Sequence, residues 1–118
     1  KLFEMVEPYL GEVAGKLVLD LGCGYGWWGN ELRNRGATVC FADGRESNLA
    51  AIQRASSHAS TLLLNVEADE LPPGPFDLVL CMGLLYHLGN PQAVLDKIAA
   101  CTSRVLIDIR FVLFYVSA

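Results

Sequence analysis

The sequence predicts a doubly wound α/β domain, with a mostly parallel sheet and helices on both of its faces. Short apolar runs alternate with helical segments, which is typical of parallel strands joined by right-handed crossovers. Hydrophobic residues make up 53% of the 118 residues and charged residues 19%. Such an apolar composition suits a sheet that is buried on both faces, and the length fits a single domain over residues 1–118.

Five apolar runs are the expected strands, and they occupy residues 17–21, 38–42, 61–66, 76–81 and 104–109. Gly22 directly follows the first run and Pro75 directly precedes the fourth, as expected where a strand meets a loop. A turn is expected at residues 72–75, which contain three prolines and a glycine. Ahead of the first strand, residues 1–13 are expected to form a helix that is interrupted at Pro8.

Three further helices are expected between the strands. The first runs from Trp27 to Arg35 and ends at Gly36, where a glycine commonly ends a helix. The second is expected to be capped by Ser47 or Asn48, with Leu49, Ile52 and Ala55 facing inward. The third begins at Asn90-Pro91, because proline suits the first helical position, and its buried stripe is Val94, Leu95 and Ile98.

The C-terminal segment, residues 110–118, reads as another apolar strand. It follows the fifth strand with neither a turn signal nor a crossover helix, and one strand over 104–118 would be unusually long. Either the chain is truncated and its last strand is improvised, or intervening residues are absent from the sequence. The C-terminal strands are therefore expected to be incomplete or altered, and both explanations stay open.

The glycine-rich segment from Asp20 to Gly26, Asp-Leu-Gly-Cys-Gly-Tyr-Gly, lies between the first strand and the first crossover helix. Glycine lets the backbone turn sharply and lets a ligand lie against bare main chain. In doubly wound sheets, ligands bind beyond the carboxyl ends of the strands. Three alternating glycines, preceded by an acid, favour a ligand site over an ordinary tight turn.

The spacing argues against a dinucleotide site, whose fingerprint is G-x-G-x-x-G. Counted from Gly22, the third glycine position is held by the bulky Trp27. The carboxylate of Asp20 would also repel a pyrophosphate, whereas it would attract a cationic amino acid.

The segment from Val18 to Gly26 resembles motif I of class I, Rossmann-like methyltransferases that depend on S-adenosylmethionine (SAM). The resemblance implies that the glycine loop packs against the amino-acid part and the sugar of SAM. It also implies that Asp20 contacts the methionine amino group, often through water. The loop residues that it assigns to the cofactor are Gly22, Cys23, Gly24 and Gly26.

Asp43 follows the second strand and matches the acid that accepts both ribose hydroxyls in this family. A carboxylate suits that task because it accepts several hydrogen bonds. Its distance of about 20 residues from the glycine loop is typical of the ribose acid in nucleotide-binding folds. Gly44 and Arg45 stand where the family commonly places an adenine-flanking residue, although Gly44 has no side chain to stack on the base.

Two later segments also resemble the family's cofactor and acceptor regions. Glu67 and Ala68 match an acid followed by alanine that contacts adenine, with Asp69 or a purely solvated acidic loop as the alternatives. Cys81 and Met82 follow the fourth strand, beneath the expected methionine moiety. Tyr86 and His87 stand near the acceptor, and both are candidate catalytic residues. His87 is either a general base, since its pKa lies near neutrality, or a structural residue of the loop.

We therefore expect a SAM-dependent methyltransferase that moves a methyl group to a small-molecule acceptor by in-line displacement. No metal-ligand pattern is present, and no metal is expected. The alternatives are a catalytically silent SAM-binding partner subunit, a tRNA-base methyltransferase and, less favoured, an NAD-dependent oxidoreductase domain. The charge of −4 and the scattered basic residues give no nucleic-acid patch.

The sequence also indicates where the protein is located and whether it pairs with a second copy. The four cysteines form no C-x-x-C pair, which favours reduced thiols in a cytoplasmic protein. No signal peptide is visible and no apolar run is long enough to cross a membrane. An incomplete sheet would expose residues 110–116 as an apolar edge, so a homodimer through the C-terminal strand is a further expectation.

Overall fold

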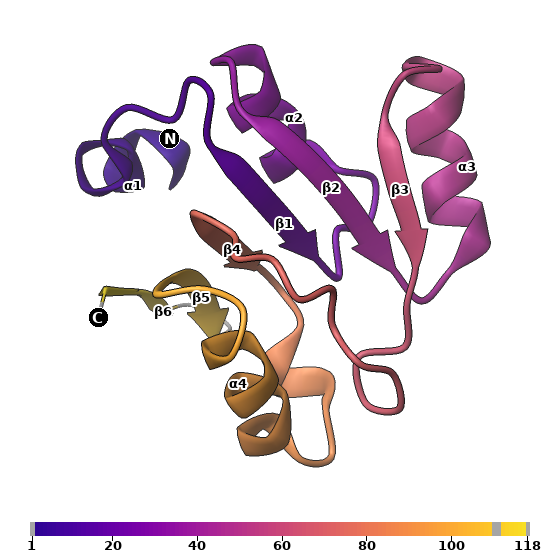
Figure 1. Cartoon of the computed structure of the whole chain (residues 1–118), viewed down its shortest axis with the longest axis vertical. Helices are drawn as coiled ribbons and strands as arrows, with labels where there is room; N and C mark the ends of the chain where they lie inside the picture. The colour runs from indigo at the N-terminus through magenta and orange to yellow at the C-terminus, as the bar shows by residue number, and fades with distance from the viewer. Residues whose placement is uncertain (1, 110–111, 118) are drawn as a thin grey trace.

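The computed structural model describes the backbone of residues 2–109 and 112–117 and the side chains of residues 3–107. Six strands form one sheet in the order β3-β2-β1-β4-β5-β6 (Figure 1). The strands are β1 (Leu17–Leu21), β2 (Thr38–Asp43), β3 (Ser60–Leu63), β4 (Leu78–Cys81), β5 (Arg104–Ile109) and β6 (Val112–Ser117). The helices are α1 (Leu2–Leu10), α2 (Trp27–Asn34), α3 (Glu46–Ala55) and α4 (Pro91–Ala99), with a short 3₁₀ turn, η1 (Leu85–His87).

The strand order confirms the doubly wound topology. Strands β1 to β5 run parallel to their neighbours, and β6 pairs with β5 in the antiparallel sense. From β1 the chain first winds outward through β2 to β3, and then crosses back to β4 on the other side of β1. The order reverses at β1 and β4, which is the position where such sheets bind ligands.

The C-terminal apolar segment forms a separate strand, not an extension of β5. Val112–Ser117 lies antiparallel to Arg104–Ile109, with Ile109 opposite Val112, while residues 110–111 lie outside the described part of the chain. Strand β6 is the edge of the sheet in this part of the structure. Pairing of two copies through this edge, which was expected for residues 110–116, stays a prediction.

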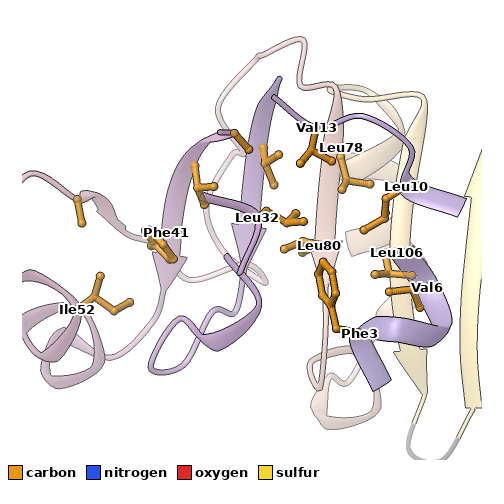
Figure 2. Close-up of a cluster of buried hydrophobic side chains, with 14 of the residues drawn as sticks. Phe3, Val6, Leu10, Val13, Leu32, Phe41, Ile52, Leu78, Leu80 and Leu106 are labelled. Carbon is orange, nitrogen blue, oxygen red and sulfur yellow. The ribbon is translucent and has the colours of Figure 1, made fainter. Parts of the chain in front are cut away.

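Alternation along the strands divides the core into two layers. On one face, α1, α2 and α3 pack against alternate strand residues such as Val18, Phe41 and Leu80 (Figure 2). On the other face, α4 packs against the residues that lie between them, such as Leu19 and Val79. Side chains in β1 therefore point in turn toward α2 and toward α4, and this alternation fixes the direction of Asp20.

The N-terminal helix differs from the prediction in two ways. Pro8 lies inside α1 and does not interrupt it. The helix ends at Leu10, short of Val13, because Gly11 adopts a left-handed φ of 68° that no longer continues the helix. Phe3, Val6 and Leu10 share the buried face of α1 and hold it against the sheet (Figure 2).

The third and fourth strands are shorter than predicted because their partners end. Asp43 is the last residue of β2 and pairs with Leu63, so β3 has no ladder partner beyond that point. In the same way, β5 begins at Arg104 and its ladder with β4 starts with Val79 opposite Val105, so β4 has no partner in β5 ahead of Leu78. Phe76 makes only an isolated bridge with Thr102.

The expected cap of α3 is also wrong. The helix begins at Glu46 after Arg45, and Arg45 makes no side-chain capping bond. Asn48 instead uses its amide to contact Asp43. Ala55 is exposed because it is the last residue of the helix. By contrast, α4 begins at Pro91 as predicted, and Asn90 caps it by accepting a hydrogen bond from the backbone N–H of Ala93. No helix in the described part of the chain has the length and apolar character of a membrane span.

The packing of α2 on the sheet makes a stability prediction. Leu32 is fully buried in the layer beneath α1 and α2, whereas Leu63 on β3 is 53% exposed. We expect Leu32→Ala to lower the free energy of unfolding by about 2–5 kcal/mol, as cavity-forming substitutions do. The matched control Leu63→Ala is expected to change it by about 1 kcal/mol or less. Urea unfolding of both variants checks this, and equal losses would contradict the assignment of the core.

Candidate functional site

A cleft of about 450 Å³ lies beyond the carboxyl ends of β1, β2, β3 and β4. Each of these strands contributes the segment that follows it, so residues far apart in sequence meet at one end of the sheet. The lining residues are Gly22, Gly24, Asp43, Gly44, Arg45, Asn48, Leu64, Asn65, Val66, Glu67, Gly83, Leu84, His87 and Leu88. The cleft is at the topological switch point, where the fold class places a ligand.

A second hollow of about 470 Å³ lies at the opposite end of the sheet. It is lined by residues that precede β1, β4 and β5, among them Lys16, Asp77 and Ser103. Asp77 accepts a hydrogen bond from the backbone N–H of Leu17 at 2.8 Å, so it holds the start of β1. This hollow lacks the glycine loop and lies away from the switch point, so we assign the functional site to the first cleft.

The glycine loop after β1 presents bare backbone to the cleft. Gly22, Gly24 and Gly26 have φ values of 66°, 57° and 83°, a region that other residues rarely adopt. A Cβ atom on Gly24 would meet no protein atom within 4 Å, so the space beside this residue belongs to the cleft. A Cβ on Gly22 would lie 3.0 Å from Leu84, which shows how closely the loop approaches the segment after β4.

Asp43 joins the glycine loop to the start of α3. Its Oδ2 atom accepts a hydrogen bond from the backbone N–H of Gly24 at 2.8 Å. Its Oδ1 atom accepts one from the backbone N–H of Arg45 at 2.8 Å and one from the Asn48 amide at 3.1 Å. The carboxylate is 9% exposed and lines the cleft. It therefore fixes the loop in place and still faces the space that a ligand would enter.

Asp20 points away from the cleft and under α2, as the alternation along β1 requires. It is 2% exposed, and its Oδ2 atom accepts a hydrogen bond from the backbone N–H of Gly29 at 3.0 Å. The residue that caps α2, Gly26, has no side chain, so Asp20 satisfies one of the free N–H groups at the start of this helix. Burial raises the pKa of Asp20 to about 7, with a smaller contribution from the Asp43 charge, while the Gly29 N–H opposes the rise.

Gly29 is a residue that the sequence reasoning missed. A Cβ at this position would lie 2.4 Å from Phe41 and 2.6 Å from Asp20, so only glycine lets α2 approach the sheet this closely. The available signal was the spacing Gly24-x-Gly26-x-x-Gly29. The spacing argument against a G-x-G-x-x-G pattern is therefore wrong, because it counted from Gly22 when the close-packing glycine is in register with Gly24.

The loop after β3 is held by two networks. Lys97 on α4 donates hydrogen bonds from Nζ to the backbone carbonyls of Val66 at 2.9 Å and Asp69 at 2.8 Å. Glu67 accepts a hydrogen bond from the backbone N–H of Gly89 at 3.1 Å, which ties this loop to the segment after η1. Glu67 lines the cleft, whereas the carboxylate of Asp69 accepts from the backbone N–H of Asn65 and serves the loop itself.

The segment after β4 forms the remaining wall. Cys81 is fully buried in the layer beneath α4, and Met82 packs against the opposite layer, so neither lines the cleft. His87, at the end of η1, does line it. The Tyr86 ring lies 4.5 Å from the His87 ring, measured between centroids, and is 38% exposed.

The structure thus brings half of the predicted site residues to the cleft wall. Those on the wall are Gly22, Gly24, Asp43, Gly44, Arg45, Glu67 and His87. Those off the wall are Asp20, Cys23, Gly26, Ala68, Cys81, Met82 and Tyr86. The remaining lining residues were not among the predicted site residues, and they are Asn48, Leu64, Asn65, Val66, Gly83, Leu84 and Leu88. Asn48 had a signal, because it lies in the first turn of the helix that follows Asp43.

A profile of the methyltransferase-domain family matches residues 2–109. The match spans the glycine loop, Asp43 and the whole parallel part of the sheet. The chain therefore belongs to the methyltransferase-domain family and has the class I, Rossmann-like fold of SAM-dependent methyltransferases.

Relatives with known roles differ in the acceptors that their names state. The chain is 35% identical over 105 residues to the ubiquinone biosynthesis O-methyltransferase of Photobacterium profundum, covering 85% of this chain and 43% of that protein. It is 32% identical over 107 residues to the tRNA U34 carboxymethyltransferase of Citrifermentans bemidjiense, covering 84% of this chain and 32% of that protein. The chain thus spans less than half the length of either relative.

Solved structures support the fold. A SAM-dependent methyltransferase from Mesorhizobium loti superposes with a TM-score of 0.80 at 23% identity, covering 89% of this chain and 51% of that one. Magnesium protoporphyrin IX methyltransferase from Synechocystis PCC 6803, solved with bound SAM, gives a TM-score of 0.77 at 24% identity, with coverage of 90% and 56%.

The buried carboxyl group of Asp20 makes a pH prediction. Its folded-state pKa of about 7 lies above the ordinary value of 3.8, so the folded chain holds this proton more tightly than the unfolded chain. Asp20 therefore contributes stability below about pH 4 that is lost as the pH rises through 7. Asn at this position keeps an oxygen for the Gly29 N–H and does not titrate. Relative to the unaltered chain, Asp20→Asn is expected to gain stability between pH 4 and pH 8.

Urea unfolding of both proteins at several pH values measures this difference. The gain is expected to be on the order of 1–4 kcal/mol, at about 1.4 kcal/mol for each unit of pKa shift. A difference between the two proteins that does not change with pH would show that Asp20 ionises normally in the folded chain.

Proposed function

We propose that the chain binds SAM in the cleft beyond β1, β2, β3 and β4 and transfers its methyl group to a small-molecule acceptor. The observation that carries this proposal is the open space beside Gly24, directly next to the Asp43 carboxylate. Bare backbone beside an acid at the end of the second strand suits a ligand with a sugar, and the family match supports SAM as that ligand.

The residues on the cleft wall fit this cofactor. Gly22 and Gly24 would pack against its amino-acid part and sugar, and Asp43 would accept from the ribose. Glu67 would contact the adenine, and Gly44 and Arg45 also line the cleft. Asp20 is buried behind the loop, so its interaction with the methionine ammonium group would run through a bridging water.

The cofactor supplies a methyl group that its sulfonium charge makes electrophilic, so the residues of the chain mainly position the reactants. The glycine loop and Asp43 hold one reactant against the sheet. His87 also lines the cleft, and it is the residue that we assign to receive a proton from an acceptor hydroxyl or amine. Tyr86, beside His87, would form part of the acceptor surface.

The choice of acceptor class is supported by the names of the relatives more than by the geometry of the cleft. The name of the O-methyltransferase relative supports an oxygen atom of a small molecule as the acceptor. The name of the carboxymethyltransferase relative favours a tRNA base as the second candidate. A catalytically silent SAM-binding subunit is the third, and only a methyl-transfer assay separates it from the enzymes.

The proposal also includes a cytoplasmic location and a homodimer. The four cysteines are free thiols, which supports a reducing compartment such as the cytoplasm. We also propose a homodimer through β6, because β6 is an edge strand of the described sheet and an edge strand can pair with another chain. Light scattering on the 118-residue chain tests it, and a monomer would exclude this mode of pairing.

Calorimetric titration with SAM, S-adenosylhomocysteine and NAD tests the cofactor. We expect SAM and S-adenosylhomocysteine to bind and NAD not to bind, and tighter binding of NAD would overturn the proposal. Gly24→Val is expected to abolish binding, because the branched side chain would enter the open space beside the loop.

Gly15→Val provides the matched control for that variant. Gly15 has a φ of 76° and open space around its Cβ position, but it lies outside the cleft. Both substitutions carry similar backbone strain, so a loss of binding confined to Gly24→Val identifies the space beside Gly24 as the ligand site. Equal binding by the two folded variants would remove Gly24 from the site.

A further inference from the structure

Glu67 connects two parts of the cleft that serve different ligands in the proposed function. It lines the cleft, where it would contact the adenine. Its Oε2 atom also accepts a hydrogen bond from the backbone N–H of Gly89 at 3.1 Å, across a separation of 22 residues. Gly89 closely follows Tyr86 and His87, which belong to the acceptor side. One carboxylate therefore joins the nucleoside side of the cleft to the acceptor side.

The backbone that carries Glu67 is held on both sides. Lys97 donates hydrogen bonds from Nζ to the carbonyls of Val66 and Asp69, and the Asn65 Oδ1 atom accepts one from the backbone N–H of Glu67 at 3.0 Å. Glu67 itself is exposed, and a long side chain of this kind loses rotamer freedom when a contact fixes it. The part of Glu67 that a ligand can still order is therefore the side chain and its carboxylate.

The segment on the acceptor side is anchored at one end by the core and at the other by Glu67. Leu85 is buried at the start of η1. The backbone N–H groups of His87 and Leu88 donate to carbonyls three residues earlier, at 3.0 and 3.1 Å, so these bonds hold the shape of the turn and not its position in the cleft. The bond from Gly89 to Glu67 reaches the loop after β3 and so helps to fix where His87 lies.

We infer that Glu67 is a positioning residue for the acceptor side of the site, through which a bound nucleoside orders the segment that carries His87. The hydrogen bond to Gly89 is exposed to water. An adenine amino group that donates to the other oxygen of Glu67 would fix the side chain, and the base would cover the bond. Hydrogen bonds strengthen where water is excluded, so the nucleoside would hold Gly89 more firmly. This inference rests on the proposed function, because it assumes an adenine base in the cleft.

Amide hydrogen exchange measured by NMR tests this role on the unaltered chain, with S-adenosylhomocysteine as the probe. At saturation, this ligand is expected to slow exchange of the His87 and Leu88 amides by about threefold to tenfold, the range for one net hydrogen bond. An analogue whose base lacks the 6-amino group has no donor for Glu67, so at saturation it is expected to leave both rates unchanged. Equal slowing by the two ligands would overturn the inference.

Two substitutions of Gly89 supply the second arm of the experiment. Gly89→Pro removes the N–H group that Glu67 accepts, and the ψ of 148° at Leu88 suits a residue before proline. Gly89→Ala is the matched control, because it keeps the N–H group and its Cβ would lie 3.7 Å from the Glu67 Oε2 atom, an ordinary contact. We expect S-adenosylhomocysteine to slow exchange in Gly89→Ala and not in Gly89→Pro. Because coupling is reciprocal, Gly89→Pro should also bind this ligand about threefold to tenfold more weakly.

The outcomes separate the inference from the proposed function. If the ligand still slows exchange in folded Gly89→Pro, it covers the turn directly, so the role of Glu67 is wrong and the SAM site stands. If Gly89→Pro does not fold, the comparison of the two ligands on the unaltered chain decides the matter. If the unaltered chain does not bind S-adenosylhomocysteine at all, the proposed function and this inference fall together.

Discussion

The carboxylate of Asp43 is the contact on which the site depends. It ends the second strand, accepts from the backbone of the glycine loop and from the start of α3, and still faces the cleft. Three segments that the sequence separates are thus fixed by one side chain. The loop needs this support because its glycines give it a flexible backbone, and flexibility would have to be lost on binding. The structure removes that freedom before a ligand arrives.

Asp20 plays a complementary part from the other side of the loop. It stabilises the start of α2 through the Gly29 N–H and keeps this helix close to the sheet. The two acids lie near enough that the charge of Asp43 adds to the raised pKa of Asp20. A cationic ligand group nearby would offset the unfavourable burial of this charge. Asp20, in β1, is therefore a structural cap at the start of α2.

The sequence predicted the strands and the order of elements, because apolar runs and glycines mark local structure directly. The alternating glycines predicted the loop, and the family resemblance together with the place of Asp43 after the second strand predicted that residue. Strand ends were less predictable. Strand β3 stops at Leu63 because its neighbour β2 ends at Asp43, and this end point depends on how the two strands pair. Alternation sends Asp20 under α2, and Asn48 reaches the cleft only because α3 begins at Glu46. Neither placement can be derived from local residue preferences, since both depend on how separate elements meet.

The affinity of Asp43→Ala for S-adenosylhomocysteine, compared with that of Asp77→Ala, tests the central role of Asp43 most directly. Both aspartates accept a backbone N–H at 2.8 Å, but Asp77 does so at the opposite end of the sheet. If Asp43 organises the site, Asp43→Ala weakens binding by about 2–3 kcal/mol, the scale of lost charge-assisted hydrogen bonds, and Asp77→Ala leaves it unchanged. Normal binding by folded Asp43→Ala would contradict this account.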